Sequence, residues 1–145
     1  MIPVGFFVRH GFRFPVFGFR LTRQMTKSKS RSFQDLEVWK LSIDLARKVY
    51  NLTSKFPASE NFGLTNQMRR AAVSIPSNIA EGQGRNSAKE FKQFPAISLG
   101  SIAELETQLI IAKEIKYLTQ EDLNPFLATL DRTRKMIKGL AKGIS

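Results

Sequence analysis

Residues 32–53 read SFQDLEVWKLSIDLARKVYNLT, and this stretch decides the expected fold class. Mostly apolar side chains recur in it at heptad spacing, which places them along one side of an α-helix. The members of this first stripe are Leu36, Trp39, Ile43, Ala46, Tyr50 and Thr53. Ser32, with Asp35 three positions later, is typical of a helix N-cap. The segment therefore predicts an amphipathic helix, which Pro57 ends because proline disfavours helix in the residue before it.

The same helix carries a second apolar stripe, which consists of Val38, Leu41, Leu45, Val49 and Leu52. At about 100° per residue, these positions fall in a sector well away from the first stripe. A helix in a monomeric bundle needs only one apolar face, so two interpretations stay open. The second stripe either widens the core face or forms a subunit interface through Val38, Leu41, Leu45 and Leu52.

Three further helical patterns follow. The second helix begins near Leu64 or Thr65 and ends at the glycines Gly82 and Gly84, and Ser87 is the expected N-cap of the third. Prolines inside both patterns, at positions 76 and 95, predict kinks.

The fourth helix has two candidate starts: Thr119 with Asp122 as a capping pair, or Asn124 with Pro125 at the first position. The connections are short, and this favours antiparallel neighbours. We therefore predict an all-α, antiparallel up-down-up-down four-helix bundle over residues 32–145.

Residues 1–31 have a different composition. They hold seven of the 23 Lys and Arg residues and none of the 12 Asp and Glu residues, so much of the net charge of +11 lies outside the bundle. Phenylalanines alternate there with Gly, Pro and Arg without a sustained helical or strand period. We interpret residues 1–31 as a disordered or non-native N-terminal extension, and Met25 as the start of the native chain.

The residue inventory argues against catalysis. There is no cysteine, and the single histidine, His10, lies in the extension. Di-iron sites that need Glu-x-x-His pairs and nucleophiles that need a histidine base therefore cannot form within the bundle. We expect no enzyme activity, no metal, no cofactor and no small-molecule substrate. The lack of cysteine suits a cytoplasmic protein, and no stretch is apolar enough to cross a membrane.

Polar residues interrupt the apolar pattern of the second helix within SIPSNIAEG, residues 74–82. Helical spacing places Asn78, Glu81 and Arg85 along one side, and Glu104 and Glu106 of the third helix are candidate partners for nearby arginines. We interpret Asn78, Glu81, Arg85, Glu104 and Glu106 as a structural polar network that fixes the helix register. A ligand or RNA contact is the alternative.

This SIPSNIAEG segment, together with FQDLEVW at residues 33–39 and QMRRA at residues 67–71, resembles a known family. The family comprises bacterial four-helix-bundle proteins encoded in intervening sequences of large-subunit rRNA genes, and it is related to accessory variability proteins of diversity-generating retroelements. The resemblance covers residues 32–142, and Pro95 departs from the family pattern. It implies a homo-oligomeric ring, favouring a pentamer, and no enzymatic activity. Its retroelement relatives bind a reverse transcriptase and nucleic acid.

The fourth helix suggests how such a protein could bind nucleic acid. Its basic residues face a single nearby acid, Asp131, and could contact phosphates; they are Arg132, Arg134, Lys135, Lys138 and Lys142. A solvated basic face is the alternative interpretation. The expected function is thus a non-catalytic oligomeric bundle that acts as an RNA-binding or ribosome-associated accessory protein. The competing hypothesis is a structural or protein–protein interaction module with no nucleic-acid role.

Overall fold

The computed structural model describes residues 7–9, 12–14, 32–85 and 87–143, which belong to two separate units, residues 1–30 and 31–145. In the first unit, β1 (Phe7–Arg9) pairs antiparallel with β2 (Phe12–Phe14). The sequence did not predict this pairing, because three-residue strands are too short to show alternation. The predicted disorder or non-native origin of residues 1–31 stays a prediction, and Met25 lies outside the described residues.

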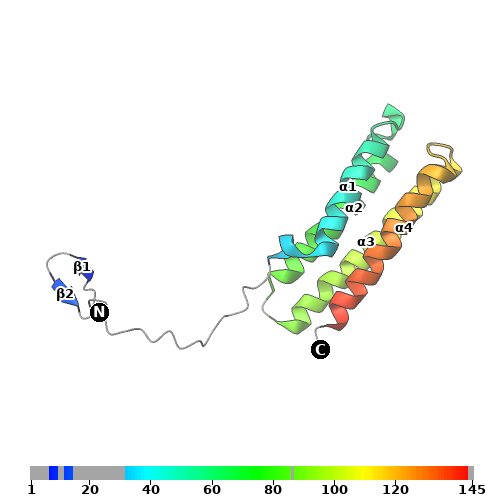
Figure 1. Cartoon of the computed structure of the whole chain (residues 1–145). Coiled ribbons are helices and arrows are strands. Elements are labelled where there is room, and N and C mark those ends of the chain that lie inside the picture. Colours follow the sequence, from blue (N-terminus) through cyan, green and yellow to red (C-terminus); the bar gives the residue numbers. More distant parts are fainter. Residues whose placement is uncertain (1–6, 10–11, 15–31, 86, 144–145) are drawn as a thin grey trace. The chain divides into compact units, whose positions relative to one another are not determined.

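The second unit is all-α (Figure 1). Its four long helices are α1 (Glu37–Thr53), α2 (Leu64–Gln83), α3 (Ala88–Glu114) and α4 (Gln120–Lys142). Two short 3₁₀ turns, η1 (Phe33–Asp35) and η2 (Ala58–Glu60), precede α1 and α2. Both α2 and α3 continue through their internal prolines.

The helices form the predicted bundle. Each helix packs on two others, so that α1 lies diagonal to α3 and α2 lies diagonal to α4. Along the α2–α3 contact, Ser74 meets Ser101, whereas Arg85, further along α2, meets Phe94, which is earlier on α3. As the residue number increases along α2, the number of its contact partner on α3 decreases, so these two helices run antiparallel. The connections between successive helices are short, as expected for this topology.

Local capping sets the helix ends. Thr119 and Asp122 form a full capping box: Thr119 Oγ1 accepts from Asp122 N at 3.1 Å, and Asp122 Oδ2 accepts from Thr119 N at 3.0 Å. Of the two predicted starts for α4, Thr119 is therefore confirmed. Ser87 caps α3 by accepting from Glu90 N at 3.2 Å, also as predicted. Ser32 does not cap α1, because the chain first makes the turn η1 and then extends at Leu36.

Of the two interpretations left open for the second stripe of α1, packing supports the wider core face. Val38, Leu45 and Val49 of the second stripe are buried in the core of their own chain, with Leu45 completely inaccessible. Leu41 and Leu52 lie half-buried on the same side of the helix. Val38 and Leu45 therefore cannot form the predicted subunit interface, because both already pack inside the bundle. A contact through the half-buried Leu41 and Leu52 stays a prediction.

The first stripe is the partly exposed one. Ile43 and Tyr50 are 42% and 45% exposed, and Trp39 is half-buried. These side chains lie beside α2 rather than between all four helices. The apolar surface left over on α1 is thus on the first stripe, not on the stripe considered as a subunit interface.

Candidate functional site

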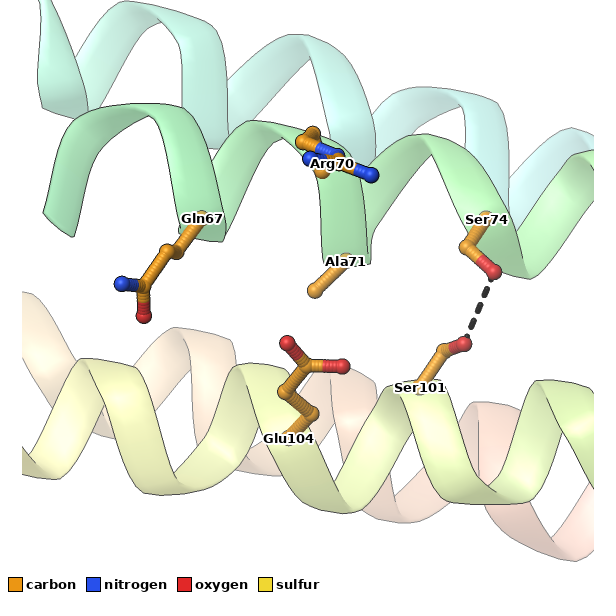
Figure 2. A pocket seen from close by; sticks show the side chains of 6 residues that line it. All are labelled: Gln67, Arg70, Ala71, Ser74, Ser101 and Glu104. Carbon is orange, nitrogen blue, oxygen red and sulfur yellow. Dashed lines mark hydrogen bonds between the residues drawn. The ribbon is translucent and has the colours of Figure 1, made fainter. Parts of the chain in front are cut away.

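Three neighbouring hollows lie along α2. The first lies between α2 and α3, has a volume of about 390 Å³ and is lined by Gln67, Arg70, Ala71, Ser74, Ser101 and Glu104 (Figure 2). The second adjoins it, because Arg70 and Ser74 line both. The third adjoins the second, and the two share Val73. The three hollows place polar, cationic and apolar surface side by side.

The first hollow is built around a serine pair. Ser74 and Ser101 share a hydrogen bond of 2.8 Å across the two helices (Figure 2). Asn78 Nδ2 donates to the Ser74 carbonyl at 2.8 Å and to Ser74 Oγ at 3.0 Å. Glu104 rises from α3 towards Ala71 in the same view and accepts from Gln108 Nε2 at 3.1 Å. This arrangement fixes the register of α2 against α3 and offers no activated nucleophile.

The predicted polar network does not come together as one cluster. Only Asn78 takes part in the α2–α3 network, whose serines the sequence reasoning did not include. Glu81 is exposed, and Arg85 stacks over the ring of Phe94 with 5.0 Å to its centroid. Glu106 faces the other way and pairs with Arg134 of α4. Helical spacing placed these residues on faces correctly but could not show which neighbouring helix each face meets.

The second hollow lies along the α1–α2 contact and has a volume of about 490 Å³. Its lining consists of Tyr50, Asn66, Arg69, Arg70, Val73 and Ser74, none of which is acidic. The guanidinium of Arg69 lies 4.6 Å from the centroid of the Tyr50 ring. Arg69 Nε also donates to Thr53 Oγ1 at 2.9 Å. Sequence reasoning did not identify this site, because Tyr50 and Thr53 of α1 meet Arg69 of α2 only through packing.

The third hollow is apolar and has a volume of about 300 Å³. It is lined by Phe33, Trp39, Ile43, Ala46, Val73, Pro76, Ser77 and Ala80. Phe33 and Trp39 pack edge to face with ring centroids 5.4 Å apart, so the turn η1 closes one side of it. Exposed apolar side chains gathered in one place are typical of a contact surface.

On α4, the structure divides the predicted basic strip into two groups. Arg132, Lys135, Lys138 and Lys142 are exposed. Arg134 is only 28% exposed and is bonded to Glu106, so its charge is paired across the half-buried contact between α3 and α4. Lys135 bonds Asp131 at 2.8 Å and holds the pKa of that carboxyl below its ordinary value. Four of the five predicted residues therefore share an open surface, and Arg134 joins two helices instead.

The described residues contain no group of three or more His, Cys, Asp or Glu that could hold a metal ion. Within the same part of the chain, no helix is long and apolar enough to span a bilayer.

A model of the 23S rRNA-intervening sequence protein family matches residues 34–139. The chain belongs to this family. The match includes α1, α2 and α3 entirely and confirms the resemblance inferred from the sequence. Residues 1–33 lie outside the family match, as does Lys142.

Solved structures also match this member of the 23S rRNA-intervening sequence family, and one of them covers most of its length. It is the crystal structure of a protein of unknown function from the S23 ribosomal protein family of Bacteroides thetaiotaomicron. The TM-score is 0.65 at 22% sequence identity, over 72% of this chain and 98% of the other. At that identity the likeness establishes the fold. A search of curated proteins gives no match.

Proposed function

We propose that this chain is a non-catalytic accessory protein that binds the backbone of RNA through the exposed basic residues of α4. The observation that supports the proposal is the open surface formed by Arg132, Lys135, Lys138 and Lys142. Membership in a family named for 23S rRNA intervening sequences makes RNA the natural polyanion to test.

Charge is distributed unevenly along the bundle. The first turn of α4 carries Glu121 and Asp122, whereas its last turns carry Lys138 and Lys142. Because α3 and α4 are joined by a short connection, the start of α3 lies at the same end of the bundle as the end of α4, as Figure 1 shows. Lys89 and Lys92 of α3 are exposed there. Phosphates would therefore be attracted to one end of the molecule.

The test compares two charge reversals of equal size in the full chain. Lys138→Glu with Lys142→Glu changes the proposed surface, and Lys55→Glu with Lys116→Glu changes exposed lysines at the other end. RNA affinity is measured by fluorescence anisotropy at several salt concentrations. The first variant should bind at least about tenfold more weakly, and its salt dependence should fall by about 0.7–0.9 in log–log slope for each phosphate that it no longer neutralises. Equal weakening in both variants, or salt-independent affinity, would contradict the proposal.

A second function, self-assembly, is favoured by the apolar hollow between α1 and α2. It needs a partner surface, and α3 supplies one: Ile97, Ile111 and Ile115 are 45–49% exposed and share one side of that helix. Two different apolar surfaces on one chain suit head-to-tail contacts, which close into a ring when the rotation allows. We propose that copies of the chain associate in this way, and a pentamer is the assembly that the resemblance implies.

Light scattering on the full chain tests this assembly. Ile43→Lys places a charge in the hollow and should reduce the mass to that of a monomer while far-ultraviolet circular dichroism stays unchanged. Ile110→Lys is the matched control, because Ile110 is also 42% exposed but points to another side of α3. If Ile43→Lys leaves the mass unchanged, the hollow is not the contact surface.

A further inference from the structure

Arg69 is held in place by α1 without being neutralised. Its guanidinium lies over the Tyr50 ring at 4.6 Å, and its Nε donates to Thr53 Oγ1 at 2.9 Å. Thr53 is buried and donates its own hydroxyl proton to the Val49 carbonyl at 2.8 Å, which fixes the direction of its lone pairs. A weaker contact of 3.5 Å joins Arg69 Nη2 to the Tyr50 carbonyl. None of these partners is a carboxylate, so the side chain is positioned while its charge stays available.

Arg70 adds a second cation to the same hollow. It is exposed, and among the described residues no carboxylate lies within salt-bridge distance of either arginine. Glu104 lies across the first hollow, on α3, and bonds Gln108. Some cationic groups of the bundle, such as Arg47, Arg134 and Lys135, do pair with an acid. The two arginines thus form an uncompensated pair in a hollow of about 490 Å³, within the usual size range of small-molecule sites.

We infer that the second hollow, between α1 and α2, is a binding site for a phosphate group. The planar guanidinium fork matches phosphate oxygens in a bidentate way, and charge-assisted hydrogen bonds of this kind are roughly twice as strong as neutral ones. A fork already oriented by Tyr50 and Thr53 loses less side-chain freedom on binding. Asn66 supplies a neutral amide donor in the same lining. The phosphate can belong to a free anion or a small ligand, or to the backbone of a polynucleotide.

This site is separate from the basic surface of α4. The α2 and α4 helices lie on a diagonal of the bundle and do not pack on each other. The inference therefore does not depend on the RNA-binding role proposed for α4, and either can fail while the other stands.

The experiment follows backbone amide resonances of the full chain by two-dimensional NMR during titration. Two probes are used: inorganic phosphate, and a short RNA with hydroxyl groups at both ends, each at constant ionic strength set with chloride. We expect phosphate to give saturable shifts centred on residues 66–74. Arg70→Gln should weaken its binding by about tenfold or more, since Arg70 is exposed and its removal leaves the core intact. Arg47→Gln is the matched control, because Arg47 is an exposed arginine on α1, and it should leave phosphate binding unchanged.

A conservative variant tests the role of Arg69, whose removal could disturb the helix contact. Arg69→Lys keeps the charge but removes the oriented fork, and should also weaken phosphate binding, whereas a site that recognises charge alone would retain it. If the RNA shifts the same amides, the site takes internal phosphodiesters; if phosphate alone does, the site takes a free or terminal phosphate.

Two results would overturn the inference: shifts that chloride reproduces, or equal effects of Arg70→Gln and Arg47→Gln. The variant Lys138→Glu with Lys142→Glu should leave the phosphate response of the hollow unchanged. That result would separate this site from the proposed role of α4.

Discussion

Replacing Lys116 by glycine should stabilise the bundle. Lys116 follows α3 with φ 65°, and it is the one non-glycine residue with a positive φ in the described part of the chain. Its N–H donates to the Lys113 carbonyl at 3.0 Å, and the N–H of Tyr117 donates to the Ala112 carbonyl at 2.8 Å. This pair of hydrogen bonds is the Schellman motif, whose left-handed position is usually glycine because a Cβ is crowded there.

The magnitude follows from two opposing terms. A left-handed conformation costs an ordinary residue about 1–2 kcal/mol, and Lys116→Gly removes that cost. Glycine also gives the unfolded chain more conformational freedom, and this reduces the gain in unfolding free energy by about 0.5–1 kcal/mol. The net gain in unfolding free energy should be about 0.5–1 kcal/mol, or roughly 2–5 °C in Tm.

Urea and thermal unfolding followed by circular dichroism measure this gain. Lys116→Ala is the matched control, because it removes the same charge and side-chain length but keeps the Cβ. The reasoning is refuted if the glycine variant is no more stable than the alanine variant.

Three further predictions concern the core and the pH dependence of stability. Leu45→Ala should lower the unfolding free energy by about 2–5 kcal/mol in chemical denaturation, because Leu45 is completely buried; a change in assembly mass with normal stability would instead restore the interface interpretation. The hydrogen bond from the backbone N–H of Thr119 lowers the pKa of Asp122 below 3.8. The stability that Asp122 contributes to the folded state is therefore complete above pH 3.8 and is lost as the pH falls through the lower folded pKa. Asp122→Asn should flatten this acid part of the stability curve. The hydrogen bond to Glu60 raises the pKa of Tyr117 above 10.0. The stability that this hydrogen bond contributes is therefore complete below pH 10.0 and is lost as the pH rises through the folded pKa. Tyr117→Phe should remove this alkaline dependence of stability, and an unchanged stability curve would contradict the prediction.

Features set by neighbouring residues could be predicted from the sequence. The four helices, the Ser87 cap and the start of α2 at Leu64 all depend on side chains within a turn or two of the backbone groups they serve. The exception at Ser32 has a local cause as well. The extended conformation of Leu36 separates η1 from α1, and a capping pattern alone does not exclude such a break.

Contacts between helices could not be predicted in the same way. Arg134 was assigned to a phosphate-binding surface, but it bonds Glu106, which is 28 positions away on α3. Arg69 meets Tyr50 and Thr53 only because α1 and α2 lie side by side, and this produced a site that no short motif announced. Electrostatic roles depend on which charges become neighbours, and neighbours are set by packing.

The sequence by itself determined an all-α bundle of four amphipathic helices after residue 31, the absence of histidine from that bundle, and a resemblance to a known family. Tertiary structure decided which stripe of α1 is buried. Periodicity gives the angle between two apolar stripes on a helix, but it does not say where the other helices stand around it. Because α1 packs on α2 and α4 with Leu45 in the core, Ile43 and Tyr50 remain partly at the surface, beside the arginines and the apolar hollow.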